Sequence, residues 1–266
     1  MSETLTRTLS GIVYIALLVS ATLYFNTFLL LFGIFLLSAV VEYCDLVQLN
    51  KLLPISIAFV GYFLFSYYNI SKTTEVALLA ATLFVSIKSI IDLFNHSKQK
   101  IDKVAKYVYL IGYVIIPLIL ITKISLLDGL YNPKMIISIF IIIWTNDTFA
   151  YLVGKSLGKN KLFERISPKK TIEGFIGGLC FAIIAGAIIS IYFVKQSLFI
   201  WIIIAMIISV FGTIGDLIES KLKRMAGVKD SGKIMPGHGG ILDRLDSVIF
   251  ATPFVFLFYQ ILYYVS

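Results

Sequence analysis

The chain is poor in charged residues, which make up only 14% of its 266 residues. Soluble domains usually contain about 25% charged residues, so the deficit excludes an ordinary soluble globular protein and a disordered protein alike. Cysteine is also scarce, since the chain contains two cysteines, Cys44 and Cys180. Two cysteines are too few for a disulfide scaffold and do not match the spacing of a zinc site. We expect both to be reduced thiols packed among apolar side chains.

Apolar residues take the place of the missing charges, since 59% of the chain is hydrophobic and its mean hydropathy is +0.93. A helix that crosses a bilayer needs about 20 apolar residues, and the sequence contains nine such stretches: 9–25, 27–47, 52–69, 75–94, 105–122, 135–153, 172–194, 198–215 and 247–265. The alternating polarity of barrel strands is absent. An open strand in lipid leaves backbone groups unpaired, so helices are required. The sequence therefore predicts an all-α, polytopic integral membrane protein with about nine transmembrane helices.

The net charge of +8 indicates how the chain is oriented in the membrane. With nine spans, the N-terminus and the loops after even-numbered spans share one side. Eighteen of the 23 Lys and Arg residues fall on that side and four on the other, with Lys88 inside a span. Cytoplasmic loops carry the excess of Lys and Arg, so we expect a cytoplasmic N-terminus. The positive charge therefore requires no nucleic-acid partner.

The chain is expected to form a single membrane domain over residues 1–266. Residues 1–125 hold the less informative N-terminal helices, while residues 135–266 carry most of the unusual polar residues. Two long cytoplasmic loops are predicted in this second half, at 154–171 and 216–246. We therefore expect the chemistry of the protein to concentrate there.

The segment 213–246 places polar residues in a helical pattern. Four of them, at spacings of 3, 4 and 3, share one face of a helix that leaves the membrane: Thr213, Asp216, Ser220 and Lys223. Two more carboxylates, three residues apart, face one way as the last span begins: Asp243 and Asp246. The Pro-Gly-His-Gly-Gly segment at 236–240 is too flexible to be helical.

These residue types together are typical of a magnesium–triphosphate site. Carboxylates at a membrane boundary are costly unless they are paired or bound to a cation. Magnesium takes one or two carboxylates together with phosphate oxygens, while lysines neutralise phosphate charge and glycine backbone groups approach it closely. For the lysines alone, a solvated loop that follows the positive-inside rule is the alternative explanation.

The other predicted loop ends in Ser-Pro-Lys-Lys-Thr at 167–171, directly before a span. Thr171 is placed to cap that helix. Lys169 and Lys170 lie at the headgroup level, where they either clamp a phosphate or simply extend their charges to the membrane surface. Asp147 is an intramembrane acid, which by default indicates a functional residue. The alternative is a hydrogen-bonded structural carboxylate.

Two further features indicate a functional role less strongly. Glu42 and Asp45 are three residues apart near a helix end, and we expect them to face water as a pair. His238, in the glycine-rich turn, is either a general base or an imidazole that stabilises the turn or contacts phosphate.

The spacing of these motifs closely resembles the signature of the phosphatidate cytidylyltransferases, also called CDP-diglyceride synthases. The resemblance lies in Ser-Lys-Leu-Lys-Arg at 220–224, Lys-Asp-Ser-Gly at 229–232, Pro-Gly-His-Gly-Gly at 236–240 and Asp-Arg-Leu-Asp at 243–246. Met235 stands where the family more often has Leu, Ile or Phe, and methionine is a similar apolar side chain. Upstream, residues 147–151 and 167–171 look like the family's second conserved region.

The resemblance implies a multi-pass enzyme of the bacterial inner membrane, with nine helices, a homodimeric arrangement and an active site facing the cytoplasm. It implies that CTP and phosphatidic acid react to give CDP-diacylglycerol and pyrophosphate, with magnesium. Metal ligation is implied for Asp216, Asp243 and Asp246. Three aspartates exceed the needs of one partly hydrated magnesium, so a second cation is also expected. Catalytic roles are expected for the same three aspartates and Lys223, and substrate contacts for Ser167, Lys169, Lys170, Ser220, Lys229, His238 and Arg244.

Two other functional classes remain open at this point. A transporter would also place polar residues in its spans, but it would favour broken helices near the midplane and an inverted repeat, and no repeat is visible. Another membrane transferase is the second alternative. The Asp-rich helices of prenyltransferases are absent, while a CTP-dependent lipid kinase would release CDP rather than pyrophosphate. No set of residues is typical of a cytosine-recognition site.

Overall fold

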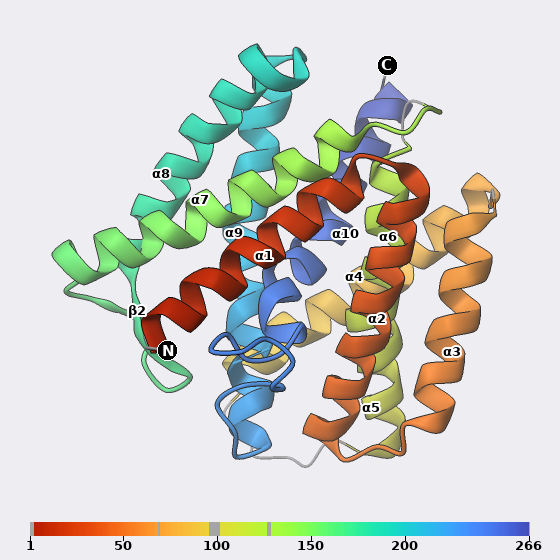
Figure 1. Cartoon of the computed structure of the whole chain (residues 1–266), viewed down its shortest axis with the longest axis horizontal. Coiled ribbons are helices and arrows are strands. Elements are labelled where there is room, and N and C mark those ends of the chain that lie inside the picture. Colours follow the sequence, from red (N-terminus) through yellow and green to blue (C-terminus); the bar gives the residue numbers. More distant parts are fainter. Residues whose placement is uncertain (1–2, 69, 96–101, 127–128, 266) are drawn as a thin grey trace.

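The computed structural model describes residues 3–68, 70–95, 102–126 and 129–265. Most of these residues lie in helices, and a short antiparallel hairpin joins two of them (Figure 1). In chain order the elements are α1 (Glu3–Thr22), α2 (Phe25–Val47), α3 (Leu52–Tyr62), the π-helical segment η1 (Phe63–Tyr67), α4 (Lys72–Phe94), α5 (Lys103–Tyr109), the π-helical η2 (Leu110–Ile115), α6 (Ile116–Ile124), α7 (Pro133–Leu157), β1 (Lys161–Phe163), β2 (Ser167–Thr171), α8 (Ile172–Ile188), the π-helical η3 (Ile189–Val194), α9 (Leu198–Met225) and α10 (Leu242–Val265).

The predicted apolar stretches all coincide with helices in the described part of the chain. Eight described helices are long and apolar enough to cross a membrane. The remaining stretch, Leu52–Tyr67, consists of 11 α-helical and 5 π-helical residues. At about 1.5 Å per residue it measures roughly 24 Å, which is less than the ~30 Å hydrocarbon core. The prediction of an all-α, polytopic membrane protein is confirmed.

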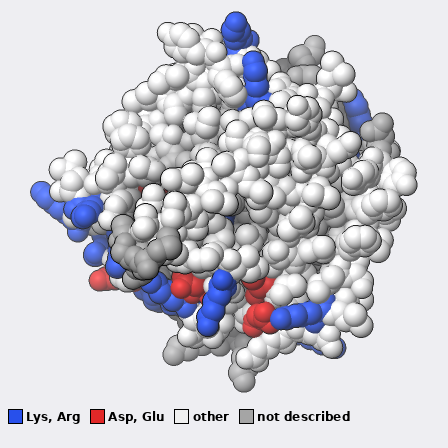
Figure 2. Space-filling model, viewed as in Figure 1, with Lys and Arg blue, Asp and Glu red and all other residues white. Residues whose placement is uncertain are grey.

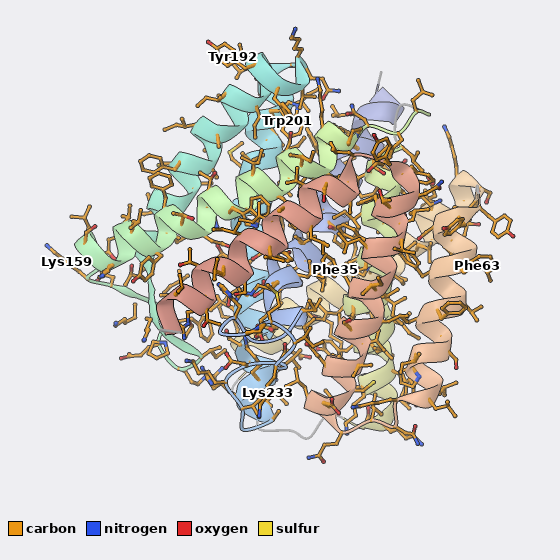
Figure 3. The ribbon with its side chains drawn as sticks, in the orientation of Figure 1. Phe35, Phe63, Lys159, Tyr192, Trp201 and Lys233 are labelled. Carbon is orange, nitrogen blue, oxygen red and sulfur yellow. The ribbon has the colours of Figure 1, made fainter. Side chains whose placement is uncertain are left out.

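The helices run between two opposite ends of the molecule. The N-terminus, the β1–β2 hairpin and the loop between α9 and α10 lie at the lower end in Figure 1, while the α1–α2 turn and the C-terminus lie at the upper end. Figure 3 accordingly places Lys233 at the lower end and Tyr192 at the upper end. Most charged side chains visible in Figure 2 gather at the lower end and lower left, beneath a broad uncharged band.

This arrangement matches the alternation of loops that the charge pattern predicts for nine crossings. Which end faces the cytoplasm stays a prediction. Most of the segment 96–104, which follows the fourth predicted span, lies outside the described residues, so Lys98 and Lys100 do not enter the comparison.

Polar side chains define where several of the helices begin. The hydroxyl, carboxylate or amide oxygens of four residues each accept a hydrogen bond from a backbone N–H in the first turn: Ser71, Asp102, Asn132 and Thr171. Such side chains satisfy donors that have no partner within the helix. The predicted cap at Thr171 is confirmed, because Gly174 N donates to Thr171 Oγ1 at 3.1 Å.

The two predicted cytoplasmic loops are shorter than expected, because helices extend into both. α7 continues to Leu157, and much of the remainder of 154–171 forms the hairpin, in which Lys161 is paired with Thr171. The loop after α9 covers only 226–241, because α9 continues to Met225 and α10 already begins at Leu242. The length of an apolar stretch underestimates the length of these helices, because the helix ends consist of polar residues.

The C-terminal helices pack closely on one another. α7 packs most extensively on α8, and α9 on α10. A Cβ atom at Gly178 would lie 2.8 Å from the backbone oxygen of Asn146, so the contact between α7 and α8 requires glycine there.

The two cysteines differ in their surroundings. Both are free, and Cys44 is buried as predicted. Cys180 is exposed on α8, so the expectation of a packed thiol is wrong there. In a membrane protein an outward-facing apolar side chain meets lipid, which removes the need for protein packing.

Cysteine labelling tests the predicted orientation. In a variant lacking Cys44 and Cys180, single cysteines replacing Lys161 or Lys233 should resist an impermeant thiol reagent in intact cells, because both exposed positions lie at the end predicted to be cytoplasmic. A cysteine replacing Lys195, between η3 and α9 at the opposite end, should be labelled. The reverse pattern of labelling would show that the orientation is inverted.

Candidate active site

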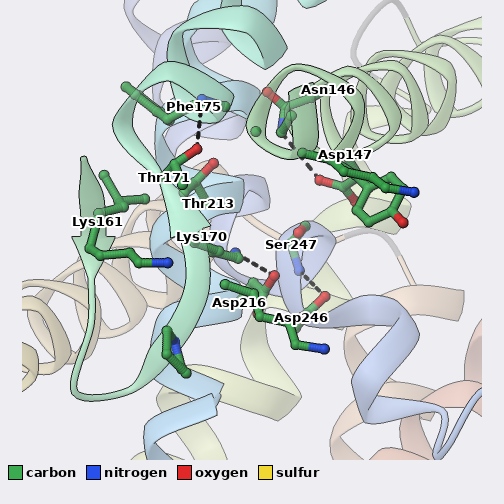
Figure 4. Close-up of a pocket in the computed structure, with 18 of the residues that line it drawn as sticks. Asn146, Asp147, Lys161, Lys170, Thr171, Phe175, Thr213, Asp216, Asp246 and Ser247 are labelled. Carbon is green, nitrogen blue, oxygen red and sulfur yellow. Dashed lines mark hydrogen bonds and ion pairs between the residues drawn. The ribbon is translucent and has the colours of Figure 1, made fainter. Parts of the chain in front are cut away.

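A pocket of about 650 Å³ opens between α7, the hairpin, α8, α9 and α10 (Figure 4). This volume lies within the range of small-molecule sites, roughly 300–1,000 Å³. The pocket is lined by charged side chains of both signs: Asp147, Lys155, Lys161, Lys169, Lys170, Asp216, Asp243, Arg244 and Asp246. Uncharged neighbours such as Phe175 and Thr213 complete the wall. The pocket therefore joins the two motif regions that the sequence singled out.

Three carboxylates form an acidic cluster, and we use this name for Asp216, Glu219 and Asp246. Asp216 and Asp246 line the pocket, while Glu219 is buried beside them. One oxygen from each lies within 4.8 Å of the others. Asp216 and Glu219 are three residues apart on α9, while Asp246 lies near the start of α10. The two helices approach closely at Gly215, where a Cβ atom would lie 2.6 Å from the backbone oxygen of Asp246. Glycine at this position brings the α10 carboxylate to the α9 carboxylates.

The acidic cluster has the properties of a divalent cation site. Glu219 is 0% exposed, and its Oε1 atom has no hydrogen-bond partner among the described residues. Its Oε2 atom lies 2.6 Å from Lys223 Nζ. A buried carboxylate oxygen without a partner is costly, and three carboxylates at this distance repel one another. Magnesium prefers carboxylate oxygens, so the residues present fit this ion.

Asp243 lies beside the acidic cluster but is already well supplied with hydrogen-bond donors. Its Oδ1 accepts from Lys223 Nζ at 2.6 Å. Its Oδ2 accepts from Ser231 N and Ser231 Oγ, both at 2.9 Å, and from Gly240 N at 2.7 Å. These contacts hold the 226–241 loop against α10. The metal role expected for Asp243 stays a prediction.

Lysine and arginine side chains supply the positive charge of the pocket. Lys170 of β2 points to Asp216, with Nζ 2.5 Å from Oδ2 (Figure 4). Lys169 and Arg244 also line the pocket and are exposed to it. Cations at this position are suited to neutralising phosphate oxygens. Of the two explanations for the lysine pair, the Lys170 geometry favours a role in the site.

The remaining predicted residues lie outside the pocket wall. Lys223 lies behind the acidic cluster, between Glu219 and Asp243, and Ser220 Oγ donates to Asp216 Oδ1 at 3.2 Å. Ser167 and Lys229 do not line the pocket. The roles expected for them stay predictions.

His238 faces the first helix rather than the pocket. Its Nδ1 lies 2.7 Å from Ser10 Oγ, and Ser10 also donates to the backbone oxygen of Pro236 at 3.0 Å. Partial burial, together with the nearby Arg244 and Arg7 charges, lowers the pKa of His238 below its ordinary value. The neutral imidazole is therefore favoured near neutral pH. This geometry favours a turn-stabilising role.

Asp147 contributes a carboxylate from the opposite wall. It lies on α7, next to Asn146, whose Nδ2 donates to Asp147 Oδ1 at 3.2 Å. Ser209 of α9 donates to Asn146 Oδ1 at 2.5 Å and thereby fixes the amide. Asp147 remains open to the pocket, so the functional explanation for this acid is favoured over a purely structural one.

Two carboxylates differ from what the sequence predicted, since Glu219 was not expected in the site and Glu42 was expected at the surface. Glu219 is separated from Asp216 and Lys223 by three and four residues, a spacing that places it on the same helical face. Glu42 was expected to face water with Asp45, and this is wrong because Glu42 is 3% exposed. Its carboxylate lies against the 226–241 loop instead. Asp45 does face water, where it pairs with Lys51.

The fold and the site define a polytopic membrane protein with a charged pocket suited to a metal ion and phosphate groups. A family model described as "Cytidylyltransferase family" matches residues 4–262. The chain belongs to the cytidylyltransferase family, and the resemblance seen in the motifs is confirmed.

Individual relatives carry a more specific name. The chain is 52% identical to a phosphatidate cytidylyltransferase of Staphylococcus haemolyticus over 128 residues, which is 47% of this chain and 48% of the relative. It is 49% identical to a protein of the same name from Bacillus subtilis over 127 residues, 47% of each chain. A Staphylococcus aureus relative is 55% identical over 116 residues, 43% of this chain and 44% of the relative. The chain thus spans about half the length of the curated relatives it matches.

Removing one carboxylate of the acidic cluster should weaken metal binding. We expect Asp246→Asn and Glu219→Gln each to reduce magnesium affinity, measured by isothermal titration calorimetry on purified protein, by about 10–100-fold. Glu75→Gln, in the first turn of α4 and away from the pocket, is the control and should leave the affinity unchanged. Wild-type affinity in both cluster variants would rule out the assignment.

Replacing Lys170 should weaken substrate use more than replacing Lys169. Of these two lysines, Lys170 makes the ion pair with the acidic cluster that the described residues show, and one charge-assisted contact contributes about 1.5–3 kcal/mol. We therefore expect Lys170→Gln to lower kcat/KM by roughly 10–150-fold. Steady-state kinetics with CTP and phosphatidic acid, the substrates that the motif resemblance implies, measure the effect. Equal, small losses for Lys169→Gln and Lys170→Gln would mean that both lysines only extend to the membrane surface.

Proposed function

We propose that this protein is a phosphatidate cytidylyltransferase, which converts CTP and phosphatidic acid into CDP-diacylglycerol and pyrophosphate. The observation that carries the proposal is the pocket itself, which joins an acidic cluster to Lys170 at one end of a bundle of membrane helices. Membership of the cytidylyltransferase family and the names of the relatives support the same reaction.

The proposed reaction places an anionic lipid and an anionic nucleotide in one site. A phosphate oxygen of phosphatidic acid attacks the α-phosphorus of CTP, a new phosphorus–oxygen bond forms, and the bond to the β-phosphate oxygen breaks. Pyrophosphate leaves with the electron pair of that bond. A phosphate monoester is already largely ionised near neutral pH, so the reaction needs no strong base. The protein contributes charge neutralisation and alignment, as in other phosphoryl transfers.

Different residues in and beside the pocket have different roles in the proposed reaction. Lys170, Lys169 and Arg244 neutralise phosphate oxygens of the two substrates in this proposal, because Lys170 pairs with Asp216 and the other two are exposed cations of the pocket wall. Lys223 holds Glu219 and Asp243 in place from behind. In this proposal Lys223 acts through the carboxylates and not on the substrate.

Magnesium would be held by Asp216, Glu219 and Asp246. When bound, it supplies positive charge that stabilises the triphosphate and the pyrophosphate leaving group. Glu219 thus joins the ligands expected from the sequence. A second cation is also part of the proposal, because Asp147 and Asp243 add carboxylates to the same pocket.

The proposal includes the surroundings of the enzyme. We place the protein in the bacterial plasma membrane with the pocket facing the cytoplasm, where CTP is synthesised. The excess of Lys and Arg at the pocket end supports this orientation. The homodimer implied by the family resemblance also belongs to the proposal, and the molecular mass of the purified protein tests it.

Product analysis tests the reaction directly. Purified protein incubated with α-³²P-labelled CTP, phosphatidic acid and magnesium should transfer label into a lipid that co-migrates with CDP-diacylglycerol, with one pyrophosphate released per lipid formed. EDTA should abolish the reaction, and added magnesium should restore it. Release of labelled CDP without labelled lipid would indicate a lipid kinase, and no turnover in folded protein would contradict the proposal.

A further inference from the structure

We infer that Glu42 of α2 is a positioning residue that fixes the start of α10, and hence Asp243 and Asp246, from the N-terminal half of the chain. The inference deepens the proposed function and rests on it. The hydrogen bonds that Glu42 makes with described residues go to the 226–241 loop and to the start of α10. Glu42 acts through the loop and the helix that carry the aspartates.

The Glu42 carboxylate caps the N-terminus of α10. Its Oε1 accepts from Ile241 N at 3.0 Å, and its Oε2 accepts from Leu242 N at 2.8 Å. The first N–H groups of a helix have no partner inside the helix, and the helix dipole favours a negative charge there. This cap comes from a residue about 200 positions away in the sequence, whereas ordinary caps come from the adjacent residue. It therefore ties α2 directly to the helix that carries Asp243 and Asp246.

The same carboxylate anchors the loop that precedes α10. Ser231 Oγ lies 3.0 Å from Glu42 Oε2 and 2.9 Å from Asp243 Oδ2, so one hydroxyl bridges the two carboxylates. Gly232 and Gly240 pack directly on Glu42, and a Cβ atom at either would overlap its carboxylate. These glycines are needed for close approach and not only for flexibility.

A continuous set of polar contacts links Glu42 to the acidic cluster. From Glu42 it passes through the Ser231 hydroxyl to Asp243, then to Lys223 Nζ at 2.6 Å, and from Lys223 to Glu219 at 2.6 Å. Each group in this set is largely buried, which makes the contacts strong and the loss of one of them costly. A shift of Glu42 therefore moves the groups that hold Glu219 and Asp243.

Glu42→Gln is the most informative substitution. The side-chain amide keeps the size of the glutamate but presents one NH₂ group, so either Ile241 N–H or Leu242 N–H loses its acceptor. We expect magnesium affinity, measured by calorimetry, and kcat each to fall about tenfold, the effect of one lost hydrogen bond to a charged group. We also expect faster trypsin cleavage after Lys229 and Lys233, because both exposed residues lie in the loop that Glu42 anchors.

Asp45→Asn is the matched control. Asp45 lies on the same helix, three residues away, but its side chain is 58% exposed and pairs with Lys51 in the described part of the chain. Its replacement should leave magnesium affinity, kcat and trypsin cleavage unchanged. Wild-type magnesium affinity and kcat in Glu42→Gln would overturn the inference. So would a fall in melting temperature with full activity per folded molecule, which would make Glu42 merely structural.

A second variant covers the case in which Glu42→Gln does not fold. Ser231→Ala leaves both helix N–H groups bonded to Glu42 and removes only the hydroxyl that lies between Glu42 and Asp243. We expect its magnesium affinity to fall by a few fold, less than in Glu42→Gln, because Ser231 N still donates to Asp243 Oδ2. Unchanged affinity would overturn the inference. If the wild-type protein forms no CDP-diacylglycerol, the proposed function fails, while magnesium affinity and trypsin cleavage still decide the role of Glu42.

Discussion

Lys223 lies between carboxylates of two neighbouring helices, and the arrangement of the site depends on this one cation. Its Nζ is 2.6 Å from Glu219 on α9 and 2.6 Å from Asp243 on α10. Burying several carboxylates together is unfavourable unless positive charge compensates them. Gly215 allows α9 and α10 to approach closely. Lys223 compensates the negative charge of the carboxylates that this approach brings together. The remaining charge of the acidic cluster is what a metal ion would neutralise.

Much of the fold was predictable because the membrane restricts the choices. Backbone groups in lipid must be paired within the segment, so even the Ile-rich stretch 136–143 is helical. The spacing of Asp216, Ser220 and Lys223 predicted one face of a helix, and α9 confirms it. Helix ends were harder to predict. Polar residues near Met225 and Leu242 continue the helices beyond the apolar stretches.

The site was predictable only where its residues are close in sequence. Glu219 follows Asp216 by three residues, but its place in the cluster depends on Asp246 of α10, a contact between helices that helical periodicity does not specify. Glu42 lies 189 positions from Ser231, so no local pattern relates them. The N-terminal helices, which offer few motifs, nevertheless hold the 226–241 loop through Glu42 and Ser10. Long-range polar contacts of this kind become visible only in the folded molecule.

Locating the bound metal tests the account most directly. Crystals of the protein grown with Mn²⁺ in place of Mg²⁺ give an anomalous signal at the metal position. We predict a peak at about 2.0–2.2 Å from oxygens of Asp216, Glu219 and Asp246, with Lys170 beside it. A peak bound by Asp243 without Glu219, or no peak in the pocket of an active protein, would contradict it.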